Sequence, residues 1–161
     1  MSLLIINYHY FGENKFKQGI YPITSKKFLN QIKLIQQNDW TIGNEKDLIR
    51  YVNGQYNPKK KLAILTFDDG LKGQIDAVKI LLKLNLSCIC YIPTAPYLNK
   101  NILDLHKFHY IRAFNKDTTI LNLLDQEFNI NEFRFNQDVL NIQYRYDNKN
   151  AKKIKYFINF V

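Results

Sequence analysis

Two adjacent carboxylates, Asp68 and Asp69, directly follow a continuous apolar run from Leu62 to Phe67. A run of this length and composition predicts a buried strand, so both acids would stand at its carboxyl end. Adjacent carboxylates repel each other and lose hydration there unless a cation or hydrogen-bond donors stabilise them. The pair is therefore a candidate for metal binding or proton transfer. The alternative is that Asp68 caps the next helix and that Asp69 and Gly70 only make a turn, because Asp-Gly is common turn chemistry.

The chain has three histidines, and two of them are spaced for chelation. His106 and His109 lie three residues apart in LHKFHY, a segment with a helical pattern, so their side chains share one helix face. With one carboxylate from elsewhere they would make a metal site with open positions for water and substrate. The alternative is that the pair only decorates the surface of a helix. His9 ends the first predicted strand, where the alternative to a functional role is a core histidine with satisfied hydrogen bonds.

The hydrophobic pattern predicts the elements that must position these side chains. Strand-length apolar runs alternate with helically spaced apolar residues. The predicted order is a strand over 3–10, a helix from Thr24 and Ser25 to Gln37, a short helix over Asp47–Asn53 closed by Gly54, a strand over 62–67, a helix over 75–84 and a strand over 86–92. This alternation favours an α/β fold with a parallel sheet, either open or closed into a barrel, with functional groups at the carboxyl ends of the strands. From Ile102 onward the pattern is mostly helical, as over Thr118–Phe128.

Length and composition indicate one globular domain over residues 1–161. The 161 residues are 46% hydrophobic and 23% charged, which suits one sizeable core. No apolar run long enough to span a membrane and no secretory signal are visible, so a soluble, cytoplasmic protein is expected. Cys88 and Cys90 would share one face of a strand, where a bridge between them would strain the backbone. We therefore expect small reduced thiols without a chemical role.

The net charge of +9 raises the question of an anionic partner. Most lysines are scattered, and clusters occur only at residues 59–61 and at Lys149, Lys152, Lys153 and Lys155. No nucleic-acid-binding motif accompanies the charge. We therefore favour a solvated basic surface and expect no nucleic-acid partner.

Several motifs together resemble the polysaccharide deacetylase family, the NodB-like carbohydrate esterases. The first is TFDDG at residues 66–70, continued by GLKGQIDAVKILLKLNLSCICYIPTAPY; the others are the opening INYHYFG at 6–12, GIYPIT and KKFLNQIKLI. TFDDG after an apolar strand is a specific signature of this family, and YIPT at the end of the next strand is a usual companion. The resemblance covers about residues 1–114 of the chain.

This resemblance implies a distorted (β/α) barrel and a divalent metal, usually zinc. It implies that Asp69, His106 and His109 are the metal ligands. Asp68 would be the general base, which takes a proton from the metal-bound water as the water attacks the N-acetyl group of an amino sugar. The expected function is thus hydrolytic removal of N-acetyl groups from a polysaccharide or glycan precursor.

His9 and several tyrosines would lie near the substrate under the same resemblance. His9 matches the Tyr-His that ends the first strand in some members, which implies a supporting or substrate-binding role. Tyr8, Tyr10 or Tyr97 would be available to stack on a sugar ring. An N-acetylated glycan is therefore the expected partner.

The chain departs from the family pattern in two ways. The family's histidine motif spaces its ligands by four residues, whereas His106 and His109 are three apart, although both spacings keep the rings on one helix face. The later motifs, which include the histidine that acts as general acid, have no counterpart, since no histidine follows His109. We therefore expect a barrel truncated after its amino-terminal half, whose open strand edges would favour dimerisation or marginal stability.

Two alternatives remain from the sequence. A non-catalytic metal- or glycan-binding remnant of the same fold would also explain the missing acid. A non-haem iron oxygenase would also use two histidines and one carboxylate, but alternating strands and helices do not suit that class, and the second carboxylate suits hydrolysis.

Overall fold

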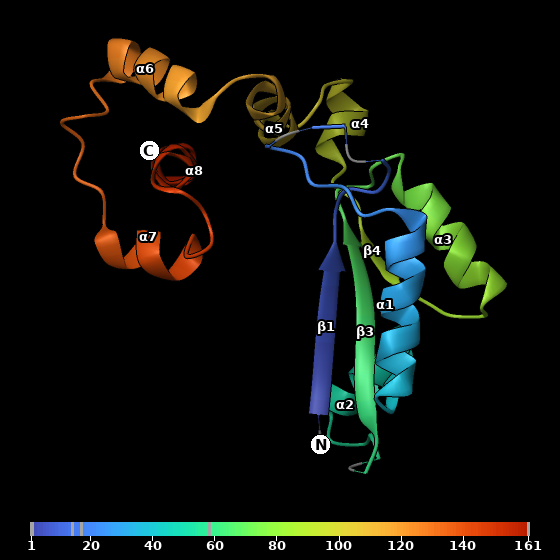
Figure 1. Cartoon of the computed structure of the whole chain (residues 1–161). Helices are drawn as coiled ribbons and strands as arrows, with labels where there is room; N and C mark the ends of the chain where they lie inside the picture. The colour runs from blue at the N-terminus through green and yellow to red at the C-terminus, as the bar shows by residue number, and fades with distance from the viewer. Residues whose placement is uncertain (1, 14, 17, 58, 161) are drawn as a thin grey trace. The chain divides into compact units, whose positions relative to one another are not determined.

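The computed structural model describes residues 2–13, 15–16, 18–57 and 59–160, which divide into two compact units. The first unit contains residues 1–15 and 20–103, and the second contains 16–19 and 104–161. The described strands all belong to the first unit, as the labels in Figure 1 allow the reader to follow. None of the described helices combines the length and the apolar character needed to cross a membrane.

A four-stranded parallel sheet forms the centre of the first unit. β1 (Ser2–Tyr8) pairs along one edge of β3 (Lys61–Asp68). β2 (Trp40–Ile42) pairs with the start of β3, and β4 (Ile89–Tyr91) pairs with its end. The predicted α/β class with a parallel sheet is confirmed, but the described strands do not close into the predicted barrel.

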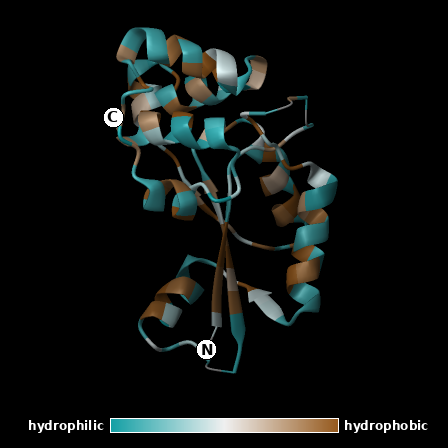
Figure 2. Ribbon diagram, turned by 60° about the vertical axis from the view of Figure 1, so that its left-hand side comes forward, coloured by the Kyte–Doolittle hydropathy of each residue, from teal (hydrophilic) through white to brown (hydrophobic). Residues whose placement is uncertain are grey.

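β3 is buried on both faces, as its uninterrupted apolar run predicts. One face packs against α1 (Ser25–Gln37) and α3 (Gln74–Lys83), which lie on the same side of the sheet (Figure 1). The buried cluster on this side consists of Tyr8, Phe28, Ile32, Ile35, Ala63, Leu65, Phe67, Ala77 and Leu81. The hydrophobic colouring of the central strands in Figure 2 follows this core. The apolar core thus fixes β3, and with it the two aspartates at its end.

Helix ends agree closely with the capping residues of the sequence. Thr24 caps α1 as predicted, because its Oγ1 accepts a hydrogen bond of 3.3 Å from the Lys27 amide. α2 (Glu45–Val52) begins two residues before the predicted start, where Asn44 and Asp47 form a reciprocal capping box. Gly54 closes α2 in a left-handed conformation, with φ of 71°.

The predicted strand over residues 86–92 is shorter than expected. Asn85 follows α3 in a left-handed conformation, and the Leu86 amide donates to the Leu81 carbonyl at 2.9 Å. Leu86 therefore completes the carboxyl-terminal turn of α3 and does not begin a strand. Only Ile89–Tyr91 pairs with β3. The short helix α4 (Ala95–Asn99) follows.

The second unit is helical through its described residues, as the pattern after Ile102 predicts. Its helices are α5 (Asp104–Phe114), α6 (Asp117–Phe128), α7 (Gln137–Gln143) and α8 (Lys149–Phe160). Its buried apolar residues are Ile120, Ile130, Leu140, Ala151 and Ile154. A buried ion pair joins α5 to α6, since the Arg112 guanidinium donates to both carboxylate oxygens of Asp117 at 3.1 and 3.2 Å.

Candidate active site

A tight turn follows β3 and presents the two adjacent aspartates. Asp69 and Gly70 both have left-handed backbone conformations, with φ of 75° and 61°. The Asp69 amide donates to the Tyr91 carbonyl at 3.0 Å, which ties the turn to the end of β4. A Cβ on Gly70 would stand 3.0 Å from the Ile92 side chain, so both φ and the available space favour glycine. The predicted turn is confirmed, and its non-glycine left-handed residue is typical of functional sites.

Asp68 does not cap the next helix, so that part of the alternative interpretation is wrong. The N-cap of α3 is Gly73, and no side chain caps this helix. The Asp68 carboxylate instead accepts a hydrogen bond of 2.8 Å at Oδ2 from the Asn7 side-chain amide. Thr66 Oγ1 donates to Asn7 Oδ1 at 3.0 Å, which fixes which end of the amide faces Asp68. This chain of bonds exists because Asn7 and Thr66 are directly paired between β1 and β3.

His9 lies beside Asp68, just beyond the end of β1. Its Nε2 is 3.7 Å from Asp68 Oδ2, and the two side chains are 47% and 32% exposed. The alternative of a buried core histidine is therefore wrong. Gln74, which is buried, donates through Nε2 to the His9 carbonyl at 2.8 Å and also to the Asp68 carbonyl. One side chain of α3 thus holds the ends of β1 and β3 together.

Tyr10 adds a protonated phenol to this end of the sheet. Burial raises the pKa of Tyr10, and the negative charge of Asp69 raises it further, to about 12. The hydroxyl therefore stays neutral at physiological pH and keeps its proton. It is a potential hydrogen-bond donor within the electrostatic reach of Asp69.

The other candidate tyrosines differ sharply in exposure. Tyr8 is buried in the core, stacks on Phe67 with ring centroids 5.5 Å apart, and donates to Gln31 at 2.9 Å. The prediction that Tyr8 stacks on a sugar is therefore wrong for a structural reason: its ring is already packed. Tyr97 is 65% exposed, and its hydroxyl lies 3.3 Å from the point where a Cβ on Gly70 would stand. Tyr97 therefore borders the turn that carries the aspartates.

His106 and His109 belong to α5 in the second unit. Their ring centroids are 6.3 Å apart at an interplanar angle of 67°, so the two imidazoles are neighbours on one helix face, as their spacing predicts. Each unit by itself contains part of the predicted ligand set, Asp69 in the first and the histidine pair in the second. Metal binding by these three residues stays a prediction.

The donor types of Asp69, His106 and His109 suit a zinc site. One carboxylate oxygen and two imidazole nitrogens are ordinary zinc ligands, and adjacent rings one turn apart suit chelation. Among the residues that the structure describes, no group of three or more histidine, cysteine, aspartate or glutamate side chains is placed to hold a metal ion. Cys88 and Cys90 are free thiols with their sulfurs 3.9 Å apart on one face, as predicted. Burial is the main cause that raises the pKa of Cys88 to about 12, which keeps this thiol protonated.

Sequence reasoning missed three residues that organise the site: Asn7, Thr66 and Gln74. Each is a polar residue in an otherwise apolar pattern. Asn7 interrupts the apolar run of β1, and Gln74 lies on the buried stripe of α3 that it shares with Ala77 and Leu81. A polar residue inside an apolar stripe needs a hydrogen-bond partner, and this was the available signal.

Several solved structures have a fold similar to that of part of this chain. No protein-family model matches the sequence, and neither does any curated protein. IcaB from Ammonifex degensii is similar in structure, with a TM-score of 0.53 and 21% identity over 59% of this chain and 40% of that chain. The de-N-acetylase of Aggregatibacter actinomycetemcomitans has a TM-score of 0.50 and 18% identity over 62% of this chain and 40% of its own. The Streptococcus pyogenes deacetylase PplD, solved in complex with acetate, has a TM-score of 0.54 and 18% identity over 68% of this chain and 52% of its own.

These similarities define the class of fold. Part of the chain has the fold found in the deacetylase structures, so the resemblance to the polysaccharide deacetylase family is confirmed at the level of the fold. The chain spans 40% to 52% of the length of these three solved chains. A shared fold does not by itself give a shared activity, which has to be argued from the site.

Proposed function

We propose that the carboxyl end of β3 is part of the active site of a metal-dependent hydrolase that removes N-acetyl groups from amino sugars. The observation that carries this proposal is the Asp68 carboxylate, held by Asn7 at 2.8 Å and followed by Asp69 in a left-handed turn. The similarity to PplD adds support, because that protein was solved with acetate, the acid that N-acetyl hydrolysis releases. The substrate class is an N-acetylated polysaccharide or glycan precursor.

In this proposal Asp68 is the general base. Asn7 occupies Oδ2 of Asp68, so Oδ1 is the oxygen that takes a proton from the attacking water. The water oxygen adds to the amide carbonyl carbon, and the carbon–nitrogen bond breaks as the proton held by Asp68 passes to the leaving nitrogen. The products are a free amine and acetic acid, which ionises to acetate at neutral pH. Asp69, His106 and His109 would hold a divalent cation, which supplies polarisation of the amide carbonyl when bound.

The neighbouring side chains have supporting roles in the same proposal. His9, 3.7 Å from Asp68, is close enough to influence the carboxylate or contact the substrate. Tyr97 offers an exposed ring beside the turn, suited to stacking on a sugar. Tyr10, kept neutral by its raised pKa of about 12, can donate a hydrogen bond to an acceptor on the substrate or to Asp69.

Acetate release from N-acetylglucosamine oligomers in the presence of Zn²⁺ tests this function. The wild-type chain should release acetate, and Asp68→Asn should be slower by at least about 100-fold, the usual range for loss of a general base. Asp76→Asn is the matched control, because it removes an exposed carboxylate from α3 outside the site. Equal rates for the wild type and Asp68→Asn would contradict the proposal.

A non-catalytic metal- or glycan-binding protein is the second candidate. Glycan binding by the wild-type chain without acetate release under any metal would favour this candidate over the hydrolase.

A further inference from the structure

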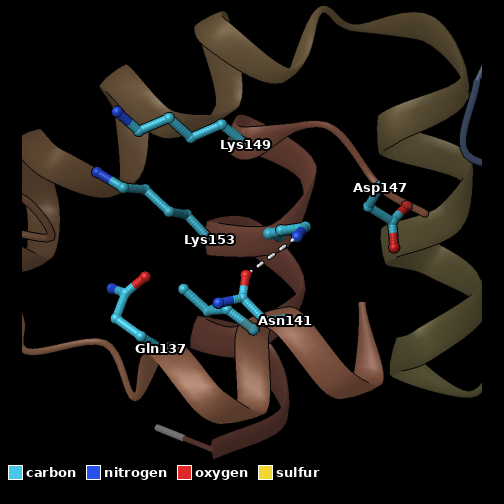
Figure 3. Close-up of a pocket in the computed structure, with 7 residues that line it drawn as sticks. Gln137, Asn141, Asp147, Lys149 and Lys153 are labelled. Carbon is cyan, nitrogen blue, oxygen red and sulfur yellow. Dashed lines mark hydrogen bonds between the residues drawn. The ribbon is translucent and has the colours of Figure 1, made fainter. Parts of the chain in front are cut away.

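A cavity in the second unit lies between α7 and α8 and is lined by cations and amides. Its volume is about 330 Å³, and Figure 3 shows the side chains that surround it. Three lysines line it, Lys149, Lys152 and Lys153, together with the amides of Gln137 and Asn141. A volume of this size is at the lower end of small-molecule sites, enough for about one sugar unit.

The positive charge of this cavity is not balanced locally. The single carboxylate in its lining is Asp147, which accepts two hydrogen bonds of 2.8 Å from Lys155. Within the described part of the chain, none of the three lining lysines forms an ion pair with a carboxylate. Lys153 Nζ does lie 5.4 Å from the centroid of the Phe135 ring, but this cation–π contact does not neutralise its charge. An anion that enters the cavity would therefore meet ammonium groups that have no carboxylate partner.

The lysines are arranged so that two of them act on one ligand. Lys149 and Lys153 are four residues apart on α8 and so lie on the same helix face. In Figure 3 their side chains run side by side toward the same end of the cavity as Gln137. Lys152 instead donates to Asn141 Oδ1 at 3.5 Å. An oxyanion between Lys149 and Lys153 would accept two charge-assisted hydrogen bonds.

Two adjoining cavities extend this lining. One of about 400 Å³ shares Lys149 and adds Lys116, and another of about 200 Å³ shares Lys153 and adds Asn122 and Asn131. The described residues that line the three cavities include many amides but no aromatic ring. Single-stranded nucleic acid is usually held by aromatic stacking, whereas side-chain amides suit the hydroxyl groups of a sugar. The lining therefore favours a carbohydrate over a nucleic acid.

We propose that this lysine cavity binds an anionic sugar unit, with its phosphate or carboxylate between Lys149 and Lys153 and its hydroxyl groups on the surrounding amides. This site belongs to the second unit alone and does not depend on the hydrolase proposed above. It also gives a role to part of the lysine cluster that the sequence analysis assigned to a solvated surface.

NMR titration of the full chain with glucose 6-phosphate tests the proposal, with resonances of residues 137–153 as the readout. The variant Lys149→Gln/Lys153→Gln should weaken binding at least about tenfold, because it removes both charge-assisted bonds. The control Lys79→Gln/Lys83→Gln removes the same charge at the same spacing from α3, and it should leave the affinity within about twofold of the wild type. Glucose and inorganic phosphate should each bind more weakly than glucose 6-phosphate.

Other outcomes would overturn the proposal. Equal weakening in both lysine pairs would show only a response to net charge. Inorganic phosphate that binds as tightly as glucose 6-phosphate would exclude a sugar-specific site. Tighter binding of an oligothymidylate at the same ionic strength and the same resonances would make the cavity a nucleic-acid site. Galacturonic acid, tested in parallel, distinguishes a carboxylate from a phosphate as the preferred anion.

Discussion

Among the residues that the structure describes, each unit has two buried polar or charged residues, and the two pairs have different consequences. In the first unit the buried polar residues are Thr66 and Gln74, both neutral. Thr66 donates to Asn7, and Gln74 donates to the carbonyls of His9 and Asp68, so both act at the end of the sheet where the aspartates stand. In the second unit the buried pair is Arg112 and Asp117, which bond to each other and join two helices.

The two pairs of buried residues have different roles: one pair positions side chains of the candidate site, and the other stabilises the packing of two helices. The hydrogen bonds of Thr66 and Gln74 orient groups that remain partly exposed, namely the Asn7 amide, the Asp68 carboxylate and His9. The Arg112–Asp117 pair is closed on itself and is 4% and 7% exposed, so it stabilises α5 and α6 without presenting a group to solvent. Buried polarity in the first unit therefore points to function, and in the second unit it points to stability.

Breaking the ion pair should have the largest effect on stability. Arg112→Ala leaves the Asp117 carboxylate buried without its partner, which should lower the free energy of unfolding of the second unit by about 3–5 kcal/mol. Hydrogen exchange should show faster exchange over residues 104–160 and little change over residues 20–103. Replacing both partners together, in Arg112→Met/Asp117→Leu, should cost much less. An equal loss of protection in both units would contradict this separation.

A glycine in the second unit should give the next largest effect. Gly19 has φ of 78°, and a Cβ there would stand 2.6 Å from the His109 carbonyl oxygen. Gly19→Ala should therefore cost about 2–4 kcal/mol from backbone strain and overpacking together. Gly54→Ala, at φ of 71° with open space around it, is the control and should cost about 1–2 kcal/mol from strain alone. Equal melting temperatures for the two variants would show that the close approach at Gly19 relaxes freely.

A substitution of Gln74 tests how much its hydrogen bonds stabilise the carboxyl end of the sheet. Gln74→Leu keeps the apolar contacts of α3 but leaves the carbonyls of His9 and Asp68 without this donor, which should cost about 1–3 kcal/mol. Denaturant unfolding measures the loss, and Gln36→Leu, at an exposed position of α1, is the matched control. A Gln74→Leu chain as stable as the control would show that these bonds contribute nothing.

The smallest effect should be the contribution of Tyr10 to the pH dependence of folding stability. Its pKa is raised from 10 to about 12 in the folded chain, so the unfolded chain loses this proton first as pH rises. The stability linked to Tyr10 is complete below pH 10 and is lost as pH rises from 10 toward 12. Above pH 10, the stability of Tyr10→Phe should therefore fall less steeply than that of the wild type. Tyr21→Phe, which changes an exposed tyrosine, should follow the wild type. Identical pH profiles for Tyr10→Phe and the wild type would contradict a raised pKa of Tyr10 in the folded chain.

Local sequence patterns predict a secondary-structure element well where neighbouring residues alone determine it. The apolar run of β3, the Thr24 cap and the turn at Asp69 and Gly70 all follow from neighbouring residues in the sequence. The start of β4 was predicted too early, because the end of α3 uses Leu86 for its own hydrogen bond. The paired strand β2 was missed, since three residues are too few to show a period.

The site was predicted less completely than the fold. The acidic residues follow an apolar strand and are visible in the sequence, but Asn7 reaches Asp68 only because β1 and β3 pair in a particular register. β1 and β3 are parallel strands about 60 residues apart in the sequence, so their pairing and the hydrogen bonds that it creates are long-range properties that local patterns do not encode. The sequence does not distinguish the buried Tyr8 from the exposed Tyr97 for the same reason, because the burial of Tyr8 depends on which face of the sheet packs against α1.

The central claim is that the aspartates of the first unit and the histidines of the second serve one metal-dependent site. Elemental analysis of the purified chain, after dialysis against trace zinc, tests it most directly. We predict about one zinc per chain, lost in Asp69→Ala and equally in His109→Ala, and retained in Asp76→Ala and in the ion-pair variant Lys155→Gln. No zinc in the wild-type chain, or zinc that survives Asp69→Ala, would contradict the claim and separate the two units in function.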